Sequence, residues 1–184
     1  MERVKKIVKS EYAVILICIL LLVVLSVITP AFASVTNMLN IVKRTATTGI
    51  VALGMTFVVC TGGIDLSVGG QVALIGTAGA LFMQSGMLSM TALFLMLFLG
   101  ILLGAVNGAL ISYLKLPPFM VTLAMVNVTE GLAFFITTGK TLYDIPGDFS
   151  KIGLATLGPI PLAAIYLVVL AVFGQFILKK TTLG

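Results

Sequence analysis

Long uncharged intervals dominate the pattern of polar and apolar positions along this chain. Charged residues are absent from 12–42, 45–64, 66–114 and 152–178. One membrane-crossing helix needs about 20 mostly apolar residues, because the hydrocarbon core is about 30 Å thick. The interval 66–114 is 49 residues long, so it holds two crossings. We place the turn between them from Gln84 to Ser89.

The apolar intervals divide into six predicted transmembrane helices. Segments rich in glycine and proline separate them and mark their ends. The predicted helices are Tyr12–Thr29, Thr45–Cys60, Leu66–Phe82, Met90–Leu114, Phe119–Thr138 and Leu162–Leu178. The pattern therefore predicts an all-α integral membrane fold, with residues 1–184 as a single transmembrane domain.

Composition excludes several classes of function. The chain is 60% hydrophobic and 9% charged, whereas soluble domains are about 45–50% apolar and about 25% charged. Too few polar residues remain to cover the exterior of a soluble enzyme or a nucleic-acid binder. The chain has no His, and we interpret Cys18 and Cys60 as small buried hydrophobic residues. We expect no catalytic residue, no metal site and no bound cofactor.

The distribution of Lys and Arg predicts the orientation in the membrane, because cytoplasmic loops are enriched in both. With the N-terminus inside, seven basic residues fall on the inner side and four on the outer side. The inner ones are Arg3, Lys5, Lys6, Lys9, Lys115, Lys179 and Lys180; the outer ones are Lys43, Arg44, Lys140 and Lys151. Both termini are then cytoplasmic. Gly139–Pro161 becomes an outer loop whose Pro and Gly residues disfavour a regular helix. Lys43 and Arg44 fit this poorly, so Pro30–Arg44 is interpreted as an interfacial or partly re-entrant helix.

A glycine-rich break between the second and third predicted helices is the first candidate site. Its sequence is Thr61-Gly62-Gly63-Ile64-Asp65-Leu66-Ser67-Val68-Gly69-Gly70. A break inside a membrane is tolerated only where protein or a water-filled cavity satisfies the backbone. In one interpretation, Asp65 caps the helix that begins near Leu66. In the other, the break lines a translocation path or forms a hinge, with Thr61, Gly62, Gly63, Asp65, Ser67 and Gly69 as its residues. The two interpretations are compatible.

Polar and small residues inside the later spans are the other candidates. Glu130 lies in the middle of the fifth predicted helix, three residues after Asn127, and an ionisable group at that depth suggests a functional site. A purely structural role for Glu130 is the alternative. Asn107 can hydrogen-bond across helices or to a polar solute. Two stripes of small residues allow close helix approach: Gly100, Gly104, Gly108 and Ser112, and Gly69, Ala73, Gly76 and Ala80.

Residues 54–56 (Gly-Met-Thr) and 61–69 together resemble the signature of the ribose-type permeases. Supporting pieces are 36–40, 104–108 with Asn107, and 179–184. The family consists of membrane subunits of bacterial ABC importers for simple sugars, with helices arranged as in vitamin B12 importers. The resemblance implies a permease in the bacterial inner membrane and a second permease copy. It also implies a periplasmic sugar-binding protein and an ATPase with two nucleotide cassettes, which holds the ATP-Mg.

The chain departs from this family in two respects. Glu130 stands where family members often carry a basic residue. Members also continue for well over a hundred residues past the point that matches Gly184, including the segment that docks on the ATPase, so we expect an N-terminal part. Two alternatives are a secondary transporter or channel that couples ions through Asp65 or Glu130, and a truncated remnant that does not transport.

Overall fold

The computed structural model describes residues 12–29 and 31–181. The N-terminal basic cluster from Arg3 to Lys9, the break at Pro30 and the terminal Thr182–Gly184 lie outside the described residues. The chain forms two compact units, Met1–Thr45 and Ala46–Gly184. The predicted single transmembrane domain stays a prediction.

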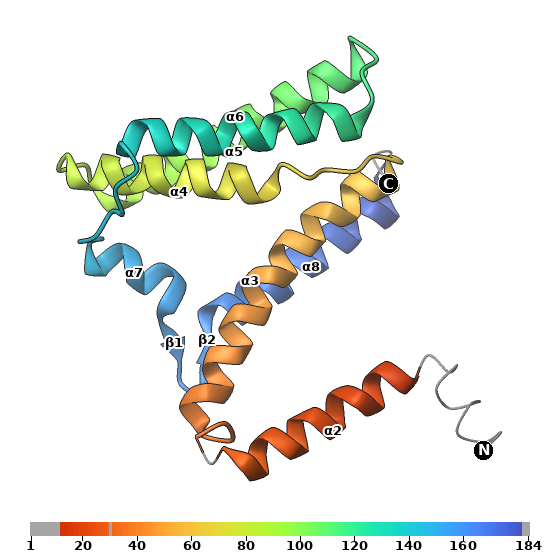
Figure 1. Cartoon of the computed structure of the whole chain (residues 1–184), viewed down its shortest axis with the longest axis vertical. Coiled ribbons are helices and arrows are strands. Elements are labelled where there is room, and N and C mark those ends of the chain that lie inside the picture. The colour runs from red at the N-terminus through yellow and green to blue at the C-terminus, as the bar shows by residue number, and fades with distance from the viewer. Residues whose placement is uncertain (1–11, 30, 182–184) are drawn as a thin grey trace. The chain divides into compact units, whose positions relative to one another are not determined.

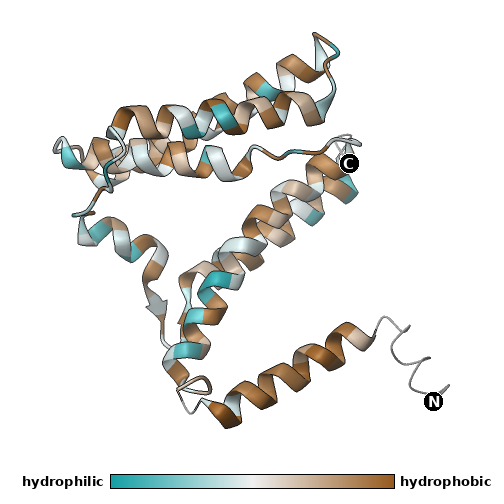
Figure 2. Ribbon diagram, in the orientation of Figure 1, coloured by the Kyte–Doolittle hydropathy of each residue, from teal (hydrophilic) through white to brown (hydrophobic). Residues whose placement is uncertain are grey.

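The first unit contains α2 (Tyr12–Ile28) and the beginning of α3 (Val35–Cys60). Figure 2 shows that α2 is hydrophobic along its whole length, as expected for a helix surrounded by lipid. The predicted start of the next helix at Thr45 is wrong, because α3 is continuous from Val35 and includes Lys43 and Arg44. No glycine or proline interrupts residues 31–48. The Ser34 hydroxyl accepts the Asn37 N–H at 3.3 Å and caps the new start.

Three helices of the second unit pack against one another: α4 (Val68–Gln84), α5 (Ser89–Ser112) and α6 (Pro118–Thr137). Figure 1 shows them side by side. Their ends lie within two residues of the predicted ones, and the predicted turn from Gln84 to Ser89 is confirmed. Small and flexible apolar residues fill the core between them: Ala80, Met83, Ala92, Val121 and Met125.

The segment after α6 is more regular than predicted. It contains α7 (Gly147–Leu154) and a hairpin of β1 (Thr156–Leu157) with β2 (Ile160–Pro161), followed by α8 (Leu162–Lys180). The predicted irregular loop over 139–161 is therefore wrong in part. Pro146, Gly147, Gly158, Pro159 and Pro161 stand at or between the ends of these elements, where they do not interrupt hydrogen bonding within a helix. The Tyr166 hydroxyl of α8 donates to the Ile152 carbonyl of α7 at 3.1 Å.

Glycines also let α8 approach the part of α3 that belongs to the second unit. A Cβ on Gly49 would lie 2.9 Å from Leu167 Cδ2, and one on Gly174 would lie 3.5 Å from the Phe57 ring. Within the described ranges, four helices are long and apolar enough to cross a membrane, namely α3, α5, α6 and α8. α2 and α4 are shorter apolar helices. The predicted all-α integral membrane fold is confirmed, and the chain is a multi-pass membrane protein.

The two cysteines correct a further prediction. Cys18 on α2 and Cys60 at the end of α3 are free and exposed, so the expectation that they are buried is wrong. Both stand on apolar helices, where lipid is an acceptable neighbour for a weakly polar thiol.

Candidate functional site

The end of α3 forms a glycine-dependent turn. Gly62 has φ +75°. The Gly62 N–H donates to the Val59 carbonyl at 2.9 Å, and the Gly63 N–H donates to the Val58 carbonyl at 3.1 Å. This pair of bonds, with a left-handed glycine between them, is the Schellman arrangement that ends a helix. The Thr61 hydroxyl also donates to Val58, at 2.7 Å. Thr61, Gly62 and Gly63 thus complete the backbone bonding at this end of the break.

The other end of the break is organised around the fully buried Ser67 hydroxyl. Ser67 Oγ donates to Asp65 Oδ1 at 2.5 Å. It accepts hydrogen bonds from Gln71 Nε2 at 2.7 Å and from Asn107 Nδ2 at 2.9 Å. A serine hydroxyl has one proton and two lone pairs, so these three bonds use its full capacity. We call Asp65, Ser67, Gln71 and Asn107 the Ser67 network.

Asp65 does not cap α4 as predicted. The residue that precedes the helix is Ser67, and α4 begins at Val68. Asp65 Oδ1 accepts the backbone N–H of Ser67 itself at 2.7 Å. This bond to the residue two positions later forms an Asx turn. The carboxylate therefore fixes the extended approach to the helix and orients the hydroxyl that binds Asn107.

The Ser67 network also determines how the Asn107 side chain is oriented. The Ser67 proton is engaged with Asp65, so Asn107 has to present its NH2 group to Ser67 and turn Oδ1 away. Asn107 is 4% exposed, and its Oδ1 has no hydrogen-bond partner among the described residues. A buried acceptor without a donor is costly. A water molecule or a further polypeptide segment is expected to supply that donor.

Close packing against α6 holds the start of α4. A Cβ on Gly70 would collide with the Thr129 hydroxyl and would lie 3.0 Å from the Val126 carbonyl. The buried Thr122 on α6 donates to its own helix at Pro118 (2.9 Å), with a longer contact of 3.3 Å to the Ile64 carbonyl of the break. Sequence analysis missed these contacts. The usable signal was the seven-residue spacing of Thr122 and Thr129, which places both on one helix face.

The remaining candidates lie on open faces of the second unit. Asn127 and Glu130 are exposed on α6. Asn127 Nδ2 donates back to the Leu123 carbonyl at 2.9 Å, and no described residue pairs with the Glu130 carboxylate. The structure brings neither of them to the Ser67 network. Gly69 is also exposed, and a Cβ there would meet nothing within 4 Å.

The predicted packing stripe on α5 is mostly open as well. Gly100 lies near Ile75 of α4, where a Cβ would come within 3.5 Å. Gly104, Gly108 and Ser112 are exposed, and Cβ atoms on the two glycines would meet nothing within 4 Å. Their role in helix packing stays a prediction, as does the role of the break in a translocation path. No group of His, Cys, Asp or Glu within the described ranges could hold a metal ion.

Comparisons with known proteins show which family the chain resembles. Residues 37–184 match the family described as "Branched-chain amino acid transport system / permease component". The chain is 32% identical over 170 residues to the ribose import permease protein of Haemophilus influenzae, covering 90% of this chain and 53% of that protein. It is 36% identical over 167 residues to the ribose import permease protein of Bacillus subtilis, covering 90% and 52% respectively.

A third relative is named for another sugar. The chain is 39% identical over 128 residues to the xylose transport system permease protein of Escherichia coli, covering 69% of this chain and 33% of that protein. The chain thus spans about half the length of the ribose permeases that it matches. No solved structure matches it, so the predicted likeness to vitamin B12 importers stays a prediction.

Proposed function

Because the chain belongs to the branched-chain amino acid transport system / permease family, we propose that it forms the transmembrane permease subunit of a bacterial ABC importer for a simple sugar. Relatives named as ribose and xylose permeases support a ribose-like monosaccharide as the solute. The chain is a transport subunit rather than a catalytic enzyme. In this proposal, ATP-Mg is bound and hydrolysed on a separate ATPase subunit with two nucleotide cassettes.

The family match carries the transport proposal, and the Ser67 network is the observation that supports a role for the break within it. A polar helix break within a membrane bundle is stable only when protein or water satisfies it. Here Asn107 reaches from α5 across to the start of α4, and Thr122 approaches the break from α6. Side chains from both α5 and α6 therefore contact the break and fix its position in the bundle. We propose that it acts as a hinge beside the translocation path.

The proposed assembly has two further partners besides the ATPase and the lipid bilayer. A periplasmic sugar-binding protein delivers the solute, and a second permease copy or paralogue completes the path. The chain lies in the inner membrane with its N-terminus in the cytoplasm, as the excess of inner Lys and Arg supports. The open small-residue faces of α4 and α5 support close partners of this kind, because such faces favour helix association.

Reconstitution in proteoliposomes tests the proposal. The protein as encoded is assembled with its neighbouring ATPase and binding protein, and uptake of radiolabelled ribose and xylose is measured. We expect uptake that requires ATP and persists when proton and sodium ionophores collapse the ion gradients. A catalytically inactive ATPase serves as the control. Uptake that needs no ATP and stops with an ionophore would instead identify a secondary transporter using Asp65 or Glu130.

Residues 1–184 alone provide a second test. We propose that they insert into the membrane but do not transport, because they correspond to only about half the length of the ribose permeases that they match, and that ATP-driven coupling needs the remaining length. ATP-dependent uptake by residues 1–184 with the same partners would contradict this account of where coupling occurs.

A further inference from the structure

A groove at the far end of the bundle from the Ser67 network is the second unusual feature of the second unit. It has a volume of about 530 Å³ and lies between α4, α6 and the segment that follows α6. Its polar lining comes from Thr77 on α4, Thr137 on α6, and Lys140 and Thr141 in the following segment; Phe134 supplies an aromatic wall. We call it the threonine groove. Its size is within the usual range of about 300–1,000 Å³ for small-molecule sites.

The backbone conformation at the end of α6 shapes one wall of the threonine groove. Helix α6 ends with Thr138 at φ +51° and Gly139 at φ +73°. The Gly139 N–H donates to the Phe134 carbonyl at 3.0 Å. The Phe134 ring lies against Gly139, where a Cβ would be 2.8 Å from ring atom Cε2. The glycine thus leaves room for a ring that is 69% exposed yet held against backbone.

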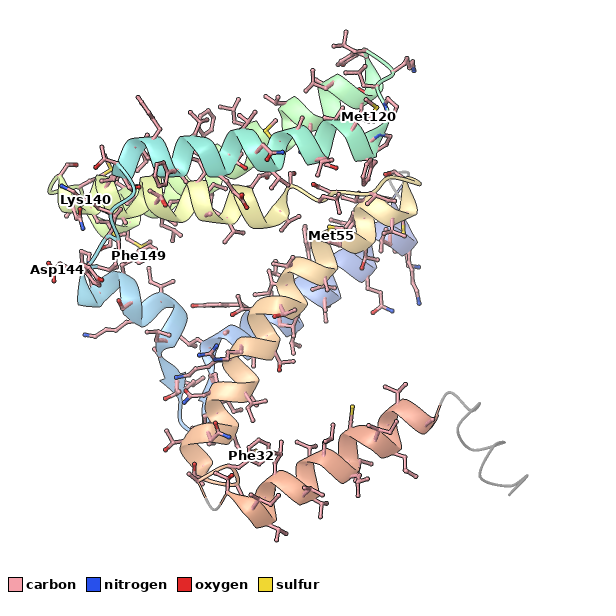
Figure 3. The ribbon with its side chains drawn as sticks, viewed as in Figure 1. Phe32, Met55, Met120, Lys140, Asp144 and Phe149 are labelled. Carbon is pink, nitrogen blue, oxygen red and sulfur yellow. The ribbon has the colours of Figure 1, made fainter. Side chains whose placement is uncertain are left out.

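The segment after α6 is also anchored to α4. Gln84 Nε2 donates to the Tyr143 carbonyl at 2.6 Å, which ties the segment to the end of α4. Figure 3 shows Lys140 at this end of α4. The groove therefore has walls fixed by hydrogen bonds on two sides.

The groove offers hydrogen-bonding groups that other contacts leave available. The Thr137 hydroxyl donates to the Ala133 carbonyl at 3.0 Å and keeps acceptor capacity. The hydroxyls of Thr77 and Thr141 have no hydrogen-bond partner within residues 12–29 and 31–181. Hydroxyl groups both donate and accept, which suits the hydroxyls of a sugar. The negative face of an exposed aromatic ring attracts the polarised C–H groups of a sugar ring.

The charges in the groove disfavour a solute that carries an ammonium group. None of its described lining residues is acidic, so the ammonium group of an amino acid would find no ion-pair partner there. Lys140 is the one charged lining residue, and an ammonium can donate hydrogen bonds to neutral hydroxyls. A zwitterionic amino acid would therefore leave its ammonium group unpaired in the groove, whereas a neutral monosaccharide brings no charge that needs a partner.

The groove lies on a face of α6 that also carries the polar residues Asn127 and Glu130. Asn127, Glu130, Phe134 and Thr137 follow one another at spacings of three, four and three residues, so they share one helix face. Asn127, Glu130 and Phe134 are all exposed. A solute that enters the threonine groove would therefore meet the intramembrane polar groups of the same face next.

We propose that the threonine groove is a low-affinity binding site for a neutral monosaccharide at the entrance of the translocation path. This inference rests on the proposed function and adds a solute-contacting site to it. Thr77 and Thr141 hydrogen-bond the sugar hydroxyls, and the Phe134 ring stacks on the C–H face of the sugar. The proposal assigns no such role to the Ser67 network.

Fluorescence titration tests the site directly, because residues 1–184 contain no Trp and the emission of the unsubstituted protein is subtracted. Phe134→Trp keeps an aromatic wall and adds one indole to the groove, and the protein as encoded is placed in nanodiscs. The control is Phe98→Trp, which replaces another exposed phenylalanine on α5. We expect a saturable emission change with D-ribose or D-xylose in Phe134→Trp and none in Phe98→Trp. Adding Thr77→Val or Thr141→Val should weaken binding about 5-fold for each lost hydrogen bond.

The outcomes separate this inference from the proposed function. If the unsubstituted protein takes up sugar with ATP but Phe134→Trp shows no saturable response, the groove assignment fails and the permease proposal stands. A saturable response without ATP-dependent uptake supports the groove and refutes the importer. Saturation by L-leucine but not by sugars overturns the neutral-sugar assignment. Equal responses in Phe134→Trp and Phe98→Trp overturn the site itself.

Discussion

The start of α4 presents two adjacent glycines with opposite surroundings. Gly70 faces α6, where a Cβ would collide with Thr129, whereas Gly69 is exposed and a Cβ there would meet nothing within 4 Å. The same contrast recurs between Gly79, whose Cβ would collide with Met96 of α5, and Gly104, which is open. Small residues in this chain thus occur both where helices pack against one another and where a helix face is exposed.

The contrast shows what a stripe of small residues means. It indicates that a helix can be approached closely on that face, but it does not identify the partner. The face of Gly69, Ala73, Gly76 and Ala80 is exposed in three of its four positions. The glycines that do carry the packing lie on neighbouring faces of α4. Their contacts depend on the side chains that α5 and α6 bring, which one helix cannot reveal.

Replacing Gly70 gives the largest expected effect. Gly70→Val forces two methyl groups into the α4–α6 contact, and overpacking of this kind costs about 1–3 kcal/mol or more. Gly69→Val is the matched control, because it makes the same change one residue away on an open face. We expect Gly70→Val to lose most monodisperse protein on size-exclusion chromatography and Gly69→Val to behave like the unsubstituted protein.

Gly69→Val also tests whether the exposed face of α4 has a function in the assembled transporter. If Gly69→Val has a normal yield but loses sugar uptake, its open face meets a partner or the solute in the assembled transporter. Equal yields of Gly70→Val and the unsubstituted protein would refute the packing contact with Thr129.

Removing the Ser67 hydroxyl gives the next largest effect. Ser67→Ala leaves the amide groups of Gln71 and Asn107 without their acceptor, and an unsatisfied buried group costs about 1–3 kcal/mol. Ser112→Ala is the control, because Ser112 is exposed on α5. We expect a lower thermal unfolding midpoint for Ser67→Ala and no change for Ser112→Ala.

A double-mutant cycle tests the network further. Asn107→Ala alone removes both the bond to Ser67 and the unpaired Oδ1. Adding it to Ser67→Ala should therefore cost less than the sum of the two single substitutions. Strict additivity would show that Ser67 and Asn107 do not act as one unit.

Sequence analysis predicted the membrane helices well because a physical length decides them. An uncharged interval long enough to cross the hydrocarbon core has few alternatives, and glycine and proline then mark its ends. It failed at the start of α3, where Lys43 and Arg44 were assigned to a segment separate from the span beginning at Thr45, although α3 is continuous from Val35. It also missed α7, an eight-residue helix too short for periodicity to be decisive.

The residues of the candidate site were predicted only in part. Asp65, Ser67 and Asn107 were selected as polar residues in apolar surroundings, and the structure brings these three together. Gln71 was missed although it bonds Ser67 only four residues away, at the start of α4. Thr122 was missed because it approaches Ile64 only in the folded bundle. Glu130 was selected by the same polarity argument, yet it lies on an open face.

Substitution of Asp65 should separate its hydrogen bonds from its charge. Asp65→Asn keeps an oxygen that can accept from both the Ser67 N–H and the Ser67 hydroxyl, whereas Asp65→Ala loses the acceptor. We expect Asp65→Asn to keep the unfolding midpoint and at least about half of sugar uptake, since the observed bonds need an acceptor rather than a charge. Asp65→Ala should lower both. Uptake lost in Asp65→Asn at an unchanged midpoint would show that the carboxylate charge serves transport.

The smallest expected effect concerns the contact between α7 and the start of α5. Asp148 in its first turn accepts a hydrogen bond from the Ser89 hydroxyl at the start of α5, and this bond lowers the pKa of the carboxyl below its ordinary value of 3.8. A lowered folded-state pKa means that the tether is fully present above the unfolded pKa and is lost as the pH falls through the folded one. Contact between α7 and α5 should therefore be constant near neutral pH and weaken only below about pH 4.

Ser89→Ala should raise the pKa of Asp148 toward 3.8. Thr91→Ala is the control and should leave this pKa unchanged, because Thr91 is an exposed residue further along α5. Carbon-13 NMR of labelled Asp carboxyls, assigned with Asp148→Asn, measures both values. Equal pKa values in Ser89→Ala and the unsubstituted protein would show that the Ser89 hydroxyl does not hold this carboxylate.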